Sequence, residues 1–489
     1  MSFELGRRTA LSGILGSSVC GAKSPASPKI PNSDEFCAGL YHELAHLSVP
    51  ANVTRLRTAG FWREGDGQQV FSRMARSPRW LLPPRMVRTA DGACWQSVDT
   101  QVTPATFGEI ADGAYHALGE RFPTLAAARR VYPFATSLTQ SIDWAAVQML
   151  ANYAVGAEGF VPPGIRVITD PVRVPARAVL TGASCARDML CFRADAATGA
   201  FVPGRGMFES VDYWNFANPD YWHWSALRRI AVDAAGIADH GIALWCMGEH
   251  SLLEDVWVER ARTANIYIGG YGAVGTLRNC SVWHAGRYGV WLSGHPSRDY
   301  PRHAVGVVAG AGSGGSYRIS NLSGDYNPMH LRADGTQIVE LTGLKSEMCP
   351  VVISIAGRAI GPGRQRWTIN GFRAEGGKRG EAFVRIEDGA LPSIEIGPGA
   401  TYNYNVLLDD CTAAAPRRIA AAQSGIASLI YGRDPGEATL IATERLGFFD
   451  AAPQPKGKLP PPLAPQATQV ERDALLNAVR ELLTSYGLA

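Results

Sequence analysis

Apolar residues between positions 160 and 412 recur in a pattern that predicts stacked coils. Five short stretches align, each with two apolar residues three positions apart: Leu253 to Val256, Leu277 to Cys280, Ile319 to Leu322, Leu341 to Leu344, and Ile369 to Phe372. Their spacings are 24, 42, 22 and 28 residues. Recurrence at this period is typical of a solenoid. Most steps therefore correspond to one coil, and the 42-residue step contains an inserted loop or two short coils.

The residue before the second apolar position is always aspartate, asparagine or glycine: Asp255, Asn279, Asn321, Gly343 and Gly371. These types tolerate the left-handed backbone needed at a sharp corner between strands. A second register supports the coils, because Ile242, Ile266 and Val290 are 24 residues apart, with Met329 and Val352 after a looser step. We predict an all-β parallel β-helix whose apolar pairs point inward.

The segment before these coils resembles the entry of a known superfamily. A helical pattern over Ser141 to Ala154 is followed by alternating strands at Gly164 to Ile168 and at Pro171 to Val174, and then by Leu180-Thr181-Gly182. This order resembles the pectate-lyase-like superfamily of right-handed parallel β-helices, in which a short helix plugs the open end. The stretches "GFWREGDGQQVF", "RTADGACWQ" and "VTPATFG" resemble the small α+β head module of bacteriophage tailspikes.

The chain divides into six predicted segments. They are a leader (1–30), a head module (36–105), a connector with the capping helix (106–160), the β-helix with its C-terminal strands (161–450), a proline-rich linker (451–466) and an amphipathic helix (467–489). Paired arginines at Arg7 and Arg8 resemble a twin-arginine export signal. The final helix carries Leu475, Val479 and Leu482 on one face and is similar to phage tail helices that trimerise. It predicts a homotrimer or docking on its own chain.

The head module contains His42-Glu43-Leu44-Ala45-His46, which matches the zinc-protease signature H-E-x-x-H. Pro50 ends any helix soon after His46, and the continuation "LSVPANV" supplies no third ligand. We therefore interpret the motif as the start of a short helix and predict no metal site from it.

Outward positions become visible once the coils are aligned. Four residues after each corner lie Glu259, Trp283, Asp325, Glu347 and Glu375. Adjacent coils would place them ~4.7 to 4.9 Å apart in a file. Stacked carboxylates suit glycoside hydrolysis, because like charges raise the pKa of the acid that protonates the leaving oxygen. Asp325 with Glu347 is the first candidate pair, near the retaining geometry, and Glu259 with Asp325 is the second, near the inverting geometry.

A lyase would use other residues. Its base would be His330, His284 or Tyr288, and Arg287 or a Ca²⁺ ion held by the carboxylates would neutralise a uronate. Trp245, Tyr267 and Trp291 would offer flat platforms for sugar rings. Trp257, Trp283 and Glu375 complete the candidate substrate contacts. Alternatively, these polar residues are an ordinary β-helix exterior, and the acids hold a structural cation.

Charge and hydropathy argue against two classes of binding partner, nucleic acid and the membrane interior. With 47 basic and 44 acidic residues, the net charge of +3 gives no polyanion footprint and argues against nucleic acid. No apolar run approaches the ~18 residues of a membrane helix. Two function classes remain: a polysaccharide depolymerase of lyase or hydrolase type, and a non-catalytic carbohydrate-binding or virion adhesion protein. The leader favours an exported periplasmic or extracellular protein over one on a virion tail.

Overall fold

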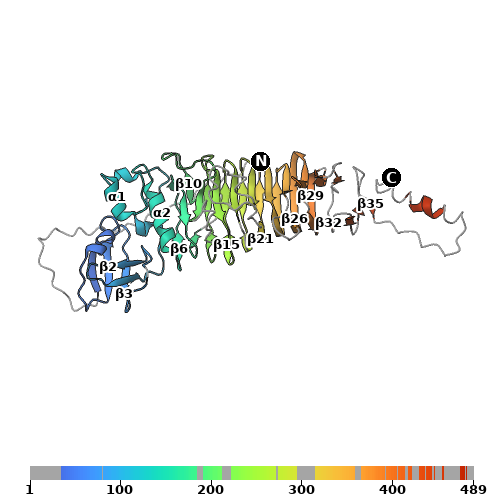
Figure 1. Ribbon diagram of the computed structural model, residues 1–489. Helices are drawn as coiled ribbons and strands as arrows, with labels where there is room; N and C mark the ends of the chain where they lie inside the picture. Colours follow the sequence, from blue (N-terminus) through green and yellow to red (C-terminus); the bar gives the residue numbers. More distant parts are fainter. Residues whose placement is uncertain are drawn as a thin grey trace, which may run out of the picture.

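The computed structural model describes residues 35–79, 81–183, 191–211, 222–270, 274–294, 314–357, 365–390, 392–404, 406–412, 417–420, 429–434, 437–442, 445–446, 454–455, 474–479 and 481. A head module at one end is followed by a long solenoid of stacked strands (Figure 1). The predicted signal around Arg7 and Arg8 lies outside the described residues. The same is true of Cys185, most of the proline-rich linker and the end of the C-terminal helix. Residues 474–479 and 481 are helical.

A small mixed sheet forms the head module. It consists of β1 (Glu35–Leu40), β2 (Arg55–Gly60), β3 (Val70–Arg73), β5 (Cys94–Ser97) and β4 (Met86–Arg88), in that spatial order. β1 and β2 are parallel, and the other pairs are antiparallel. Leu56, Phe71 and Trp95 are fully buried in its core. Phe61, directly after β2, packs edge-on against Phe107 at 5.4 Å, so the head module continues into the connector.

The H-E-x-x-H sequence forms the short 3₁₀ helix η1 (Tyr41–His46) of the head module. Its Glu43 carboxylate accepts a hydrogen bond of 2.8 Å from the backbone N–H of Leu40. The glutamate therefore caps the helix that carries it. No group of three or more His, Cys, Asp or Glu residues in the described part of the chain is arranged to hold a metal ion.

Helix α2 (Ile142–Tyr153) covers the open end of the solenoid. It follows η2 (Pro104–Phe107), η3 (Leu118–Glu120) and α1 (Leu125–Val131). Ser141 caps α2 by accepting the N–H of Trp144 at 2.9 Å. Gln148 then bonds both backbone groups of Arg173, accepting its N–H at 2.7 Å and donating to its carbonyl at 2.8 Å. The side chains of α2 thus satisfy backbone groups that an end strand would leave unpaired. The plugging helix implied by the resemblance is present.

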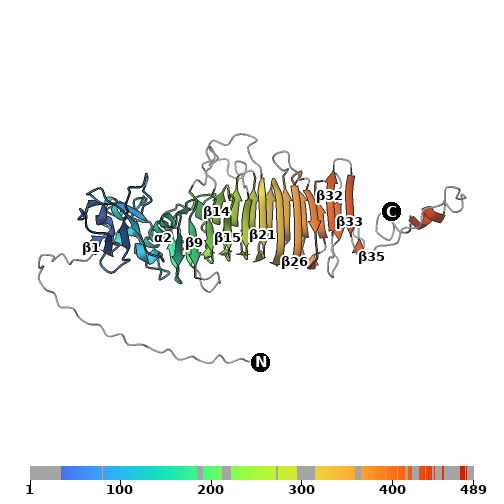
Figure 2. The ribbon, with the colours of Figure 1, turned by 90° about the horizontal axis from the view of Figure 1, so that it is seen from below.

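Figure 2 shows the strands of the solenoid stacked side by side along its axis. Strand pairing divides them into three faces: the first two belong to one large sheet, in which β24 and β26 run through both, and the third is a separate sheet. Successive strands pass from the first face to the second and then to the third. The first face contains β6 (Glu158–Val161), β9 (Val179–Gly182), β12 (Ala226–Arg228), β15 (Ser251–Glu254), β18 (Val274–Arg278), β21 (Gly314–Ser320), the first halves of β24 (Thr336–Glu347) and β26 (Gln365–Gly380), and β28 (Pro392–Ile396).

The second face contains β7 (Arg166–Ile168), β10 (Phe192–Ala194), β13 (Ala231–Asp233), β16 (Trp257–Glu259), β19 (Ser281–Trp283), β22 (Ser323–Asp325), the second halves of β24 and β26, and β29 (Gly399–Tyr404). The third face contains β8 (Val172–Val174), β11 (Gly206–Ser210), β14 (His240–Trp245), β17 (Ala264–Gly269), β20 (Tyr288–Ser293), β23 (Met329–Asp334), β25 (Val351–Ala356), β27 (Ala382–Glu387) and β30 (Val406–Asp410). The predicted right-handed parallel β-helix is confirmed.

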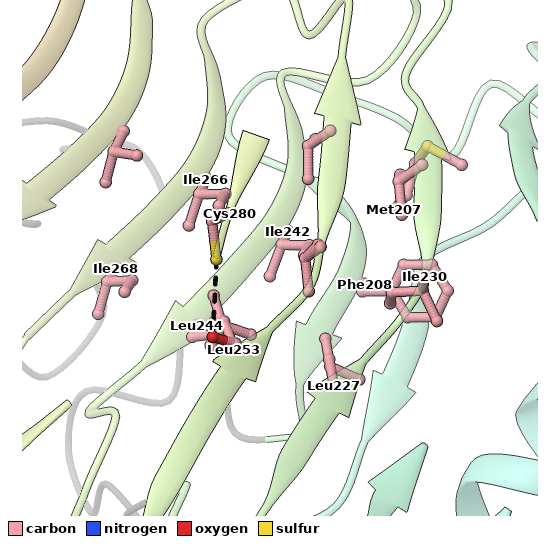
Figure 3. Packing of buried hydrophobic residues seen from close by; sticks show 14 of the residues in the cluster. Met207, Phe208, Leu227, Ile230, Ile242, Leu244, Leu253, Ile266, Ile268 and Cys280 are labelled. Carbon is pink, nitrogen blue, oxygen red and sulfur yellow. Dashed lines mark hydrogen bonds between the residues drawn. The ribbon is translucent and has the colours of Figure 1, made fainter. Parts of the chain in front are cut away.

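The predicted coil alignment is also confirmed by the strand pairing. Leu253, Leu277, Ile319, Leu341 and Ile369 are successive partners, and all are buried. Ile242, Ile266 and Val290 form a second buried row. Figure 3 shows Ile242 and Ile266 packed beside Leu244, Ile268 and Leu253 inside the coils, where the Cys280 thiol donates to the Leu253 carbonyl at 3.6 Å. Stacking like residues fills the interior without voids.

The corner between the first and second faces has the predicted left-handed backbone. Asp255, Asn279, Asn321, Gly343 and Gly371 have φ angles between +52° and +73°. Three of their side chains form a ladder, in which Asn279 donates to Asp255 at 2.9 Å and Asn321 donates to Asn279 at 2.8 Å. At Gly343 a Cβ atom would lie 2.3 Å from Oδ1 of Asn321. Glycine therefore ends the ladder there without a clash.

One part of the second register was wrong. Val290 is followed by Leu331 and Ile353, so Met329 is displaced by two positions and Val352 by one. Near positions 329 and 352 several neighbouring residues are apolar. After the long 42-residue step, the spacing alone does not determine which of them pairs with Val290. β18 pairs directly with β21, and β19 with β22, so this step contains an insertion and not an extra coil. Residues 295–313 of that insertion are outside the described part.

The parallel order ends near β30. β31 (Arg417–Ala420), β32 (Leu429–Asp434) and β33 (Glu437–Ala442) pair antiparallel, as do the short β34 (Arg445–Leu446) and β35 (Gln454–Pro455). Across the described residues, no helix has the length and apolar character required to cross a membrane.

Candidate functional site

The predicted carboxylate file exists on the second face. Glu259, Trp283, Asp325, Glu347 and Glu375 are partners on consecutive strands β16, β19, β22, β24 and β26. The strand spacing of ~4.8 Å therefore separates the backbones of Asp325 and Glu347. Trp283 occupies the coil between Glu259 and Asp325, so this second pair is two strand spacings apart.

Asp325 and Glu347 differ in their environments. Asp325 is 5% exposed, whereas the side chain of Glu347 is 34% exposed and lies 2.7 Å from the Lys345 ammonium. Burial, and next the charge of Glu347, raise the pKa of Asp325 to about 6, and Lys345 acts in the opposite direction. The pair thus combines a carboxyl whose pKa is raised toward neutral pH with a carboxylate that is ion-paired to a lysine.

Glu259 belongs to a different network. The Arg260 guanidinium pairs with Asp233 on the preceding coil, with Nε 2.8 Å from Oδ1, and lies 3.8 Å from Glu259. Glu259 is 3% exposed and accepts the indole N–H of Trp257 at 3.3 Å. These contacts hold Glu259 toward Arg260 and Trp257, away from Asp325.

Aromatic side chains extend the file at this end. Trp257 and Trp283 are partly exposed and stack at 4.9 Å with an angle of 28° between their rings. At the following corner His284 stacks on Tyr326 at 5.0 Å and 9°. The tryptophan stack lies on the two coils before Asp325, Tyr326 follows Asp325 directly on its own coil, and both stacks offer flat surfaces of the kind that sugar rings contact.

The residue types at this second corner did not mark it in advance. Arg260, His284, Tyr326 and Met348 follow the file on successive coils and all have φ between +52° and +58°. Since none of them is glycine, asparagine or aspartate, composition does not mark them as left-handed. They could have been located only by their position, one residue after each aligned member of the carboxylate file.

A groove of about 370 Å³ runs beside the carboxylate pair along the first corner. Asn279, Ser281, Asn321, Leu322, Ser323, Gly343 and Lys345 line it. Ser281 and Ser323 share a hydrogen bond of 2.6 Å. Hydroxyl, amide and ammonium groups therefore lie next to Asp325 and Glu347, where a bound sugar would need hydrogen-bond partners.

Other predicted residues are not brought to this site. His330 is fully buried and points inward, which corrects its expected place beside the file. At Gly324, on the inner side of β22, a Cβ atom would lie 2.8 Å from Nε2 of His330, so glycine makes room for the ring. Burial lowers the pKa of His330 to about 3, and only the backbone of Ser323 favours its charged form. A neutral interior imidazole does not reach a substrate.

The expectation of exposed platforms is also corrected for the third-face aromatics. Trp245, Tyr267 and Trp291 are 2%, 1% and 7% exposed. They pack in a cluster with Tyr288, because four large rings on adjacent coils bury one another. Trp291 donates its indole N–H to Asp334 at 2.8 Å. These residues form an outer layer on the third face, around the corner from the carboxylate file.

The remaining lyase candidates are dispersed. Arg287 is exposed at the start of the third face, 5.3 Å from the ring of Tyr288. Tyr288 is 6% exposed, and His284 lies at the corner. Arg287 and the nearly buried Tyr288 thus lie together at the start of the third face, whereas His284 lies at the corner after the carboxylate file.

Comparisons with known proteins find similarity only among solved structures. No family model matches the sequence, and no curated protein matches it. Similar structures include the enzymatically active domain of tailspike protein 2 from bacteriophage CBA120 (10% identity, 76% of this chain, 52% of that chain, TM-score 0.41). The chain thus spans about half of that tailspike domain.

Two further structures are similar. One is the tailspike gp49 of Acinetobacter baumannii bacteriophage Fri1, a capsular polysaccharide depolymerase (10% identity, 75% of this chain, 66% of that chain, TM-score 0.39). The other is PfbA, a surface adhesin of Streptococcus pneumoniae (8% identity, 70% of this chain, 100% of that chain, TM-score 0.35). The β-helix is established by the strand pairing of this chain, and these likenesses assign no residue a role.

Proposed function

We propose that the chain binds a polysaccharide along the second face and hydrolyses it, with Asp325 as general acid and Glu347 as nucleophile. The observation that carries the proposal is the environment of Asp325, whose pKa of about 6 is raised by burial and by Glu347 on the next coil. A carboxyl must keep its proton to protonate a leaving oxygen, and a neighbouring carboxylate must lack one to attack.

The reaction follows from this division of roles. Protonated Asp325 donates its proton to the glycosidic oxygen as the bond to the anomeric carbon breaks, and a carboxylate oxygen of Glu347 bonds to that carbon. Asp325, now ionised, takes a proton from a water molecule, whose oxygen bonds to the anomeric carbon as the bond from that carbon to Glu347 breaks. Adjacent strands favour this retaining course, because its carboxyl groups lie ~5 to 5.5 Å apart. Trp257, Trp283 and the groove lined by Ser323 supply sugar contacts.

A non-catalytic carbohydrate-binding role is the second candidate. The ion pair between Lys345 and Glu347, at 2.7 Å, favours it, because a carboxylate engaged by an exposed lysine is also what an ordinary β-helix exterior contains. In that case the aromatic stacks and the groove would bind sugar, and the carboxylates would only shape the surface.

The test is incubation of the purified full chain with a panel of acidic and neutral bacterial and plant polysaccharides. We expect reducing ends without the ultraviolet absorbance of unsaturated uronates. Asp325→Asn and Glu347→Gln should each lower the rate by ~10² to 10⁴-fold, and Glu375→Gln, farther along the file, should change it little. Unsaturated products would overturn the hydrolase in favour of a lyase. Binding without any product would establish the second candidate.

We propose in addition that the protein is exported, on the strength of Arg7 and Arg8 in the leader. Cell fractionation of the full chain and of an Arg7→Lys, Arg8→Lys double variant tests this, since export should be lost only in the variant. Recovery of the chain in purified phage particles would instead support a virion tail location.

A homotrimer is proposed from the amphipathic pattern of residues 467–489. Light scattering on the full chain should give three times the mass of one chain, and truncation after residue 466 should reduce it to one. A monomeric full chain would favour docking of the helix on its own solenoid.

A further inference from the structure

A second groove lies at the capped end of the solenoid. It has a volume of about 340 Å³, and its walls include Phe134, Gln140, Asn152, Asp170, Arg173 and Arg205. This volume falls within the ~300 to 1,000 Å³ of small-ligand sites. Arg173 is on β8, five strand steps along the third face from β23, the coil of Asp325. At ~4.8 Å a step, the groove and the carboxylate pair are ~24 Å apart along the axis.

Arg173 provides an exposed guanidinium at this groove, and its charge acts on the buried Glu209. Its nearest partner in register is Glu209 on β11, which is buried. Both oxygens of Glu209 are already engaged: one lies 2.7 Å from the Arg205 guanidinium, and the other accepts the N–H of Gly206 at 2.8 Å. The exposed Arg173 guanidinium forms no ion pair with the residues that the structure describes.

Neighbouring amides leave hydrogen-bond donors open and occupy acceptors. Gln140 donates to one oxygen of Asp170 at 2.9 Å, and the other oxygen of Asp170 is buried. Gln148 donates to the side-chain oxygen of Asn152 at 3.1 Å, so the NH₂ group of Asn152 remains available. Among the described residues, the groove therefore presents two donor groups, the NH₂ of Asn152 and the Arg173 cation, beside the Asp170 carboxylate, which is bonded through one oxygen to Gln140. A ligand that pairs with Arg173 and Asn152 carries acceptors and a negative charge.

Aromatic side chains also line the groove. Phe134 packs edge-on against Trp144 at 5.4 Å, and the indole N–H of Trp144 is bonded to the carbonyl of Pro171 at 3.2 Å. These two side chains thus offer carbon surface and no free donor. Carbon surface in the same groove as a cation and an amide fits a ring with one carbon-rich face and a carboxylate substituent.

Helix α2 fixes the backbone from which Arg173 extends. Gln148 bonds the backbone N–H and carbonyl of Arg173 on β8, at 2.7 and 2.8 Å. We propose that this groove is a separate binding site for a carboxylate-bearing sugar, with Arg173 paired to the carboxylate and Asn152 donating to a ring oxygen or hydroxyl. The site does not depend on the proposed hydrolase.

The experiment is calorimetric titration of the full chain with trigalacturonate, maltotriose and sodium acetate. Trigalacturonate should bind, and Arg173→Gln should weaken its binding at least tenfold with an unchanged thermal unfolding midpoint. Glu347→Gln is the matched control at the distant site and should leave this affinity unchanged.

Each other outcome contradicts the proposal in a distinct way. Equal affinity for maltotriose would remove the role of charge, and equal affinity for acetate would reduce the groove to a general anion site. Undiminished binding by the Arg173→Gln variant, or weakened binding only in Glu347→Gln, would place the ligand elsewhere. Cleavage of polysaccharides by the Arg173→Gln variant reports separately on the hydrolase.

Discussion

Replacing Asp325 with asparagine should stabilise the protein at neutral and alkaline pH while it removes the proposed acid. Asparagine has nearly the same shape and cannot ionise. In the folded chain the charged form of Asp325 is disfavoured by burial and by Glu347. The substitution therefore removes an unfavourable charge, and the stability of the variant should exceed that of the natural chain wherever Asp325 is ionised.

The magnitude and its pH window follow from the raised pKa. The folded-state pKa is about 6 against an ordinary 3.8, so the folded chain holds this proton more tightly than the unfolded chain. Stability from this carboxyl is fully present below about pH 4 and is lost as the pH rises through 6. At about 1.4 kcal/mol per pH unit, the difference reaches about 3 kcal/mol as an upper limit. Relaxation of the ionised group reduces it, and we expect about 1 to 2 kcal/mol.

The assay compares thermal unfolding of the natural chain and the Asp325→Asn variant from pH 4 to pH 8. The two midpoints should nearly agree at pH 4, diverge between pH 4 and pH 6, and keep a constant separation above pH 6, with the variant higher. Glu375→Gln is the control, since an exposed carboxylate 3.7 Å from Arg373 should contribute little at any pH. A difference between the natural chain and Asp325→Asn that is the same at pH 4 and pH 8 would refute the reasoning.

Two further predictions concern the capping helix and the first corner. Gln148→Leu leaves the N–H and carbonyl of Arg173 without their partners. We expect the free energy of unfolding, measured by denaturant titration, to fall by about 2 to 3 kcal/mol. An unchanged free energy of unfolding would contradict the capping role. Gly343→Ala and Gly371→Ala place a side chain at φ of +73° and +62°, but only the first meets Asn321, at 2.3 Å, whereas the nearest atom to the second is 3.8 Å away. Both should lower the unfolding midpoint, Gly371→Ala by about 1 kcal/mol and Gly343→Ala by more; equal losses would show that backbone strain alone decides.

The fold could be predicted because each coil repeats the same requirement. A buried apolar pair flanks a corner that needs a residue with left-handed backbone. Asp255, Asn279 and Gly343 indicate that corner because aspartate, asparagine and glycine adopt this conformation readily. Once the corner was aligned, counting four residues onward was enough to find Asp325 and Glu347 in register. Because the strands pair in parallel without shifts, one correctly aligned residue fixes the partners of every other residue on its strand.

Burial on the third face could not be predicted in this way. Strand alternation assigns side chains to the inner or outer side, but it does not tell whether outer rings cover one another, as Trp245, Tyr267 and Trp291 do. Alternation also fails at the start of β23, where His330 turns inward beside Gly324. Gly324 in the "SGD" sequence was the one available sign of this exception. A glycine that points into a coil leaves space, and another side chain, here His330, must fill it.

The second corner supports the location of the functional site. Arg260, His284, Tyr326 and Met348 adopt a left-handed backbone there, a conformation that costs of order 1 to 2 kcal/mol each for such residue types. Backbone preference therefore does not explain the choice of residues at this corner. Their side chains stand next to the carboxylate file, Tyr326 is 52% exposed, and its ring is stacked on His284 immediately after Asp325. We infer that these residues are kept for contacts at the surface beside the proposed sugar site.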